Sequence, residues 1–249
     1  MKRFFLNEDF RNGRRKLRHG AMPYIRKLRQ LSKISVWLVD GEYVRKNICE
    51  DFVNYDHHGR LFFIPEDEFW IAEGSRPDEM RFFMDRMYVE HVLIASGMGY
   101  DKASEKAAIF EKRERAKVVE MEKPSNSRMD RGLAEKVRKK LLKSYSGRVK
   151  VWIVDSTLVR DLLFTDFGGG GHDMVYRFIP ENEIWIDDDI PPAGRKFIIL
   201  HELHERMLMA AGASYADGHA KATVVEDFFR HHPKRTMDAI RKEKARQFA

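Results

Sequence analysis

The stretch RLFFIPEDEFWI (residues 60–71) returns as VYRFIPENEIWI (residues 175–186), with seven of the twelve positions identical. Two further pairs of segments follow the same shift of 115 residues: ISVWLVDGEYVR (34–45) with VKVWIVDSTLVR (149–160), and LIASGMGYDKASEKA (93–107) with LMAAGASYADGHAKA (208–222). Because one constant shift aligns all three pairs without a gap, the sequence predicts two copies of a single structural unit.

The repeat divides the chain into five expected segments. These are a basic helical segment (1–32), a first repeat (33–122), a linker with a basic helix (123–147), a second repeat (148–232) and a basic tail (233–249). The Pro, Ser, Asn and Gly residues of KPSNSRMDRG (123–132) are typical of a linker.

The second repeat predicts a strand, a hairpin and a pair of helices. Alternating β-branched residues indicate strands, and an apolar run that ends at a glycine indicates a helix. The expected elements are a strand at 149–155, a hairpin made of YRFIP (176–180) and EIWID (183–187), and helices at 196–211 and 215–230. This order predicts an α+β fold made of two tandem repeats.

The composition bounds the class of protein. Of the 249 residues 43% are hydrophobic, so a core can form, and the net charge is +7. No apolar run approaches the roughly 20 residues that span a bilayer, and the first 20 residues lack the apolar region of a signal peptide. The single cysteine, Cys49, excludes an internal disulfide framework. We therefore expect no membrane partner and a cytoplasmic or virion-associated protein.

Basic residues gather in KVRKKLLKSYSGRVK (136–150) and RHHPKRTMDAIRKEKAR (230–246). Such segments form either solvated helix faces or a surface that attracts nucleic acid. No recognised nucleic-acid motif accompanies the charge. A nucleic-acid partner therefore stays an alternative to a solvated surface.

The most unusual segment is FIILHELHERMLM (197–209), which is apolar on nearly every side and yet contains two histidines and two glutamates. A buried ionised carboxylate is costly unless something compensates it. On a helix, His201 and Glu205 share one face. The pattern His-Glu-x-x-His binds zinc through its histidines, with the glutamate as general base. Here Glu205 replaces the second histidine, and carboxylate oxygen is also a zinc ligand.

A catalytic zinc site with one open position needs a third protein ligand. The second helix offers His219, and a helix that turns back would bring it opposite His201. We therefore predict one Zn²⁺ ion held by His201, Glu205 and His219, with Glu202 polarising a bound water. Nitrogen and oxygen donors favour zinc.

Other residues have open roles. His204, three positions after His201, is predicted as an alternative ligand, a second-shell partner or a core histidine. Glu226 on the second helix and His172 are further candidates, each either as a partner that orients a ligand or as an alternative ligand. His172 follows four glycines, so it lies either on a loop that contacts substrate or on a mobile loop without a role. The alternative for the whole set is a buried polar network that fixes helix packing.

The stretch EIWIDDDIPPAGRKFIILHELHE (183–205) resembles the core of the small zincin metallopeptidases, particularly the ImmA/IrrE type. The resemblance covers about 40 residues, from Glu183 to Glu226. It implies that His201 is a zinc ligand and Glu202 the catalytic base, whereas Glu205 stands where the family has its second histidine. The wider pattern also resembles uncharacterised proteins of phages and their hosts.

The first repeat lacks the candidate set. Across the shift of 115 residues His201 becomes Arg86, Glu202 becomes Met87 and His219 becomes Ser104, whereas Glu205 and Glu226 persist as Glu90 and Glu111. Joint loss is what a shared site predicts, so we expect a degenerate first repeat. The guanidinium of Arg86 is then expected to pair with Glu90.

Two classes of function follow. The first is a zinc-dependent hydrolase acting on a peptide or protein, in which Glu202 moves the proton. The second is a non-catalytic binding or structural protein, phage- or nucleic-acid-associated, made of two related modules.

Overall fold

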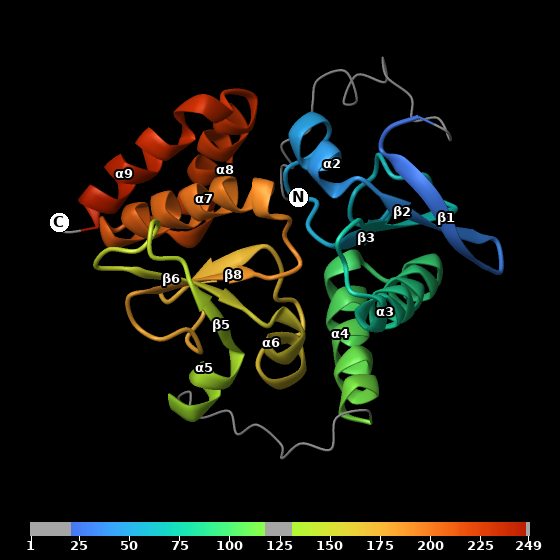
Figure 1. Cartoon of the computed structure of the whole chain (residues 1–249). Helices are drawn as coiled ribbons and strands as arrows, with labels where there is room; N and C mark the ends of the chain where they lie inside the picture. Colours follow the sequence, from blue (N-terminus) through green and yellow to red (C-terminus); the bar gives the residue numbers. More distant parts are fainter. Residues whose placement is uncertain (1–20, 118–130, 248–249) are drawn as a thin grey trace. The chain divides into compact units, whose positions relative to one another are not determined.

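The computed structural model describes residues 21–117 and 131–247 (Figure 1). The chain divides into two compact units, Met1–Glu122 and Lys123–Ala249. Each unit combines a four-stranded sheet with helices, so the α+β prediction is confirmed. In the part of the chain that is described, no helix is both long enough and apolar enough to cross a membrane.

Unit 1 has a mixed sheet with the strand order β1-β2-β4-β3. The central strands β2 and β4 are parallel, and the outer strands β1 and β3 each pair antiparallel. The elements of unit 1 are β1 (Tyr24–Leu31), β2 (Ile34–Val39), α2 (Gly41–Asn47), β3 (Tyr55–His57), β4 (Glu68–Ala72), α3 (Pro77–Ala95) and α4 (Tyr100–Ala116).

Unit 2 has the strand order β5-β6-β8-β7. Its elements are α5 (Arg131–Val137), β5 (Arg138–Leu141), β6 (Lys150–Val154), α6 (Ser156–Leu162), β7 (Gly170–His172), β8 (Glu183–Asp187), α7 (Pro192–Ala210), α8 (Tyr215–His231), the 3₁₀ helix η1 (Pro233–Arg235) and α9 (Thr236–Arg246). The parallel register of its central pair, Lys150 opposite Glu183, matches Ser35 opposite Glu68 in unit 1 at the shift of 115.

The central strand β8 carries α7 on one face. All five of its residues are buried, and side chains alternate between the two faces of a strand. Ile184 and Ile186 pack with Leu200 and Leu203 of α7, whereas Trp185 packs in a separate cluster with residues from α5 and α6. The apolar faces of β8 and α7 therefore fix the helix that carries the candidate residues.

The predicted hairpin of residues 176–180 with 183–187 is wrong. Residues 176–180 form turns, and the antiparallel partner of β8 is the glycine-rich strand β7. The side chains of Tyr176 and Phe178 pack against the hydrophobic cluster that contains Trp185. Gly171 makes this possible, because a Cβ there would lie 2.5 Å from the Tyr176 ring.

Two basic segments that were expected to be helical contain strands. The expected helix over 1–32 includes β1 within its described part, and residues 1–20 lie outside the described residues. The expected helix in 123–147 is confirmed at 131–137, but the chain then enters β5. Both strands are sheet edges, where basic side chains discourage pairing with another chain.

The expected tail at 233–249 is largely a packed element. α9 lies against α7, and Ile240 is fully buried in the core of unit 2. The candidate helix α7 is therefore enclosed by β8, α8 and α9 (Figure 1).

Candidate metal centre

The candidate residues lie on two adjacent helices, α7 and α8. Helical spacing puts His201 and Glu205 one turn apart on the same face of α7, and α8 brings His219 opposite them. His201 and Glu205 are buried, at 7% and 3% exposure, whereas the side chain of His219 is 40% exposed. The cluster is thus a buried pair with one rim histidine.

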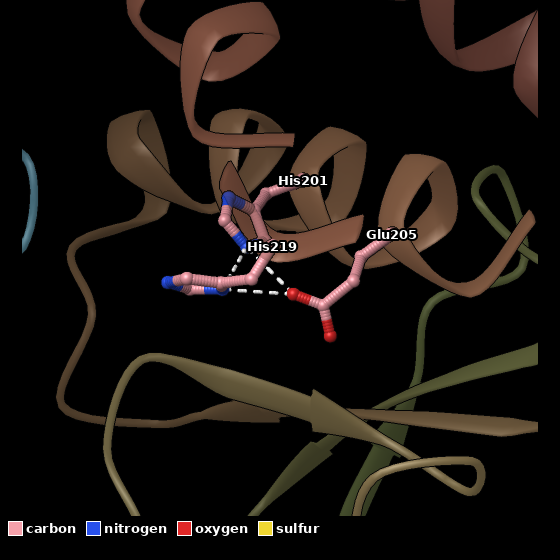
Figure 2. Close-up of side chains that lie close together, drawn as sticks. All are labelled: His201, Glu205 and His219. Carbon is pink, nitrogen blue, oxygen red and sulfur yellow. Dashed lines mark hydrogen bonds and ion pairs between the residues drawn. The ribbon is translucent and has the colours of Figure 1, made fainter. Parts of the chain in front are cut away.

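Three donor atoms converge on one point (Figure 2). His201 Nε2 lies 3.3 Å from Glu205 Oε2 and 3.2 Å from His219 Nδ1, and His219 Nδ1 lies 2.8 Å from Glu205 Oε2. Ligand bonds of 2.0–2.1 Å in tetrahedral geometry separate ligand atoms by about 3.3 Å. Two of the three separations match that value closely, so the predicted ligands do come together as one metal-sized triangle.

The second ring nitrogen of His201 faces a carboxylate. His201 Nδ1 lies 2.9 Å from Glu226 Oε2 on α8. Arg230, one turn further along α8, donates to Glu226 Oε1 at 2.6 and 2.9 Å. A ligating histidine usually donates its other N–H to a carboxylate or carbonyl. If His201 holds an ion through Nε2, Glu226 faces the ring nitrogen that remains.

Glu205 is also held by a second partner. Its Oε1 lies 3.0 Å from His172 Nε2 on β7. His172 Nδ1 accepts the backbone N–H of Met174 at 3.2 Å, so the neutral ring carries its proton on Nε2 and donates it to Glu205. His172 is fully buried and part of a strand, so the predicted loop is wrong, whereas its contact with Glu205 places it beside a candidate ligand.

Glu202 lies close to the triangle without joining it. A carboxylate oxygen of Glu202 lies within 4.8 Å of donor atoms of His172 and Glu205. Both ring nitrogens of His172 are already used, one as a donor to Glu205 and one as an acceptor from Met174, so no nitrogen is left there for a second ion. A Cβ at Gly170 would lie 3.0 Å from Glu202 Oε1. The glycine of β7 therefore leaves room for the Glu202 carboxylate.

Four ionisable groups in and around the cluster have strongly shifted pKa values. Burial, reinforced by the negative charge of Glu205, raises the pKa of Glu202 to about 8. Burial opposes ionisation of Glu226, but the charge of Arg230 and the contact with His201 hold its pKa at about 2. The pKa of Glu205 is lowered despite burial by hydrogen bonds from three histidines. Burial lowers the pKa of His201, but its contacts with Glu205 and Glu226 outweigh burial and raise it well above the usual value.

His204 is not brought to the cluster. Its Nδ1 lies 3.2 Å from Glu243 Oε1 on α9. Of the three predicted roles for His204, this placement fits the core histidine, because the ring faces the helix that covers α7 on another side.

Sequence reasoning missed two contributors, Arg230 and Gly170. A signal for Arg230 was present, because Arg115 follows Glu111 by four residues just as Arg230 follows Glu226. Gly170 lay in a run of four glycines and had no distinguishing pattern.

The cluster suits a small divalent cation. Glu202, Glu205 and Glu226 bring three carboxylates into a buried region where Arg230 supplies one fixed positive charge. Two imidazole nitrogens and one carboxylate oxygen form a donor set typical of catalytic zinc. Such an ion would balance the carboxylate charge in place of the protons that His201 and Glu202 hold through their raised pKa values.

No family model, no curated protein and no solved structure matches the chain.

Proposed function

We propose that unit 2 is a zinc-dependent hydrolase of the peptidase type, with His201, Glu205 and His219 as ligands and Glu202 as general base. The convergence of three donor atoms, each at 2.8–3.3 Å from the next, carries the proposal. The contacts of Glu226 and His172 with two of those ligands support it, because binding sites built for a metal orient their ligands in this way.

The chemistry follows from the charges of the residues. Zinc, when bound, lowers the pKa of a coordinated water to about 7 and polarises a carbonyl oxygen. Glu202, with a pKa raised to about 8, would be ionised by the positive charge of the ion. Its carboxylate can then accept a proton from the attacking water and deliver it to the departing amine nitrogen.

The proposal includes a relationship between the two units. Both sheets have the same strand order, and the paired residues of β2/β4 and β6/β8 correspond at a shift of 115. We take this match, together with the repeated sequence, as support for a duplicated zincin-like unit in which only the second copy keeps the ligand set.

The test uses the full chain loaded with zinc and a mixed peptide library, with products identified by mass spectrometry. We expect cleavage by the wild type. Glu202→Gln should keep its zinc but lose about 10²- to 10⁴-fold in rate, because proton transfer is removed while the ligands stay. Glu181→Gln, the same change at an exposed glutamate of unit 2, is the control and should retain full activity.

Two results would contradict the proposal. A Glu202→Gln variant that cleaves at the wild-type rate would overturn Glu202 as the general base. A zinc-loaded wild type that cleaves nothing would overturn hydrolysis, and the non-catalytic binding function would replace it. If nucleic acid is the partner, the purified protein should retain DNA or RNA, and this retention should weaken steeply as the salt concentration rises.

A further inference from the structure

Unit 1 keeps the histidine that orients the central glutamate of the candidate metal centre. His57 Nε2 lies 2.9 Å from Glu90 Oε2, as His172 contacts Glu205 at 3.0 Å in unit 2. The backbone N–H of Gly59 donates to His57 Nδ1 at 3.1 Å, which fixes the same tautomer as in His172. The orienting histidine is therefore present in a unit that lacks both ligand histidines.

In unit 1 the guanidinium of Arg86 lies beside Glu90. Arg86 takes the position of His201, and its side chain is 5% exposed. Its Nε donates to Glu90 Oε1 at 3.1 Å, its Nη1 to Glu111 Oε2 at 3.2 Å and its Nη2 to Ser104 Oγ at 3.1 Å.

These three partners occupy the positions that His201 contacts in unit 2. Glu90, Ser104 and Glu111 correspond to Glu205, His219 and Glu226 at the shift of 115. A permanent cation within the chain thus meets the two buried carboxylates that both units share.

The space beside the site is also filled in unit 1. Tyr55 occupies the position of Gly170, and its ring stacks on Phe83 with the centroids 4.3 Å apart. In unit 2 the counterpart of Phe83 is Ile198, whose Cγ2 would lie 2.9 Å from a Cβ on Gly170. Unit 1 therefore carries a large ring at the position where unit 2 has Gly170 beside Glu202, and this ring packs against the hydrophobic cluster that contains the fully buried Met87.

We propose that unit 1 is a closed, metal-independent form of the same site, in which the guanidinium of Arg86 takes the place of the metal ion and Tyr55 fills the space beside it. The inference rests on the proposed zinc site of unit 2. It assigns to unit 1 a latent metal centre that two substitutions open: Glu90 is already in place, and only the two histidines are missing.

The first experiment measures zinc per chain by elemental analysis after loading and dialysis. Arg86→His combined with Ser104→His should raise the content from about one to about two ions per chain, because the ligand triangle is restored beside its existing orienting groups. Arg86→Gln with Ser104→His is the matched control and should stay at about one, since it removes the guanidinium and supplies only one histidine.

The reciprocal experiment avoids dependence on how well the unit 1 variant folds. His201→Arg combined with His219→Ser should give a folded unit 2 that binds no zinc. Its melting temperature without metal should exceed that of the control His201→Gln with His219→Ser, because a guanidinium pairs with Glu205 and Glu226 and a neutral amide does not.

The outcomes separate the two proposals. A wild type without zinc overturns the proposed function. A wild type with one ion and a folded Arg86→His/Ser104→His variant that still holds one ion overturns the latent site alone. If that variant does not fold, a reciprocal variant that melts no higher than its glutamine control overturns the replacement of the ion by a guanidinium.

Discussion

His172 on β7 donates its Nε2 proton to Oε1 of Glu205 on α7, across 3.0 Å. This bond joins the edge strand β7 to a candidate metal ligand on α7. It leaves Oε2 of Glu205 facing His201 and His219. The matching His57 and Glu90 lie 2.9 Å apart in unit 1, so the same bond holds the carboxylate beside two histidines in unit 2 and beside Arg86 in unit 1.

His172→Asn should weaken zinc binding without removing a ligand. The shorter side chain cannot reach Glu205, and loss of a group that orients a ligand typically costs about 10- to 100-fold in metal affinity. Competition with a chelator gives the dissociation constant. His57→Asn makes the same change in unit 1 and should leave zinc affinity unchanged. Equal affinities for both variants would show that His172 does not act through Glu205.

Gly170→Ala should destabilise unit 2. The added Cβ would meet Ile198 at 2.9 Å and Glu202 at 3.0 Å, and overpacking of this kind costs about 1–3 kcal/mol. Urea denaturation measures the change in the free energy of unfolding. The control is Gly147→Ala, whose Cβ would contact only the end of the Lys244 side chain, at 3.5 Å. If both variants are equally stable, the close approach at Gly170 has no energetic consequence.

Arg115→Met should strongly destabilise unit 1. Arg115 is 1% exposed, donates to both oxygens of Glu79 at 2.8 and 2.9 Å, and contacts Glu111 at 2.8 Å. Removing one partner of a buried ion pair leaves uncompensated charge and costs about 3–5 kcal/mol. Thermal or urea unfolding provides the measurement.

A surface arginine provides the comparison for Arg115. Arg241 pairs with Asp238, but both side chains are at least 70% exposed, so Arg241→Met should leave the free energy of unfolding unchanged within error. A similar loss of stability in the two variants would contradict the account of Arg115.

Asp189 should make the stability of unit 2 fall as pH rises. Burial and the neighbouring charge of Asp187 raise the pKa of Asp189 to about 7, against about 4 in an unfolded chain. The folded state therefore binds more protons than the unfolded state between these values, and ionisation of Asp189 lowers stability there. Because Asp189→Asn cannot ionise, its stability relative to the wild type should improve from about pH 5 to about pH 8. A constant difference across this range would contradict the assignment.

Much of the candidate metal centre could be predicted from the spacing of residues along α7. Helical periodicity put His201 and Glu205 on one face, and Gly212, with a φ of 95°, marked where the chain turns back toward His219. The pairing of Arg86 with Glu90 followed from the same spacing, and the contact of 3.1 Å confirms it. Local geometry within helices was enough for these contacts.

The contacts that depend on strand pairing could not be predicted in this way. Residues 176–180 carry apolar residues at alternate positions and so look like a strand, whereas the true strand β7 is Gly-Gly-His. The placement of His172 depends on its pairing with Ile184 of β8 and on its distance from Glu205, 33 positions away. No local pattern encodes either relationship.

Elemental analysis of zinc in the purified, dialysed full-length protein tests the central claim most directly. We predict about one zinc ion per chain in the wild type and none when His201 and His219 are both replaced by alanine, because a single carboxylate cannot hold the ion. A wild type without zinc after loading, or a double variant that retains as much zinc as the wild type, would contradict the account.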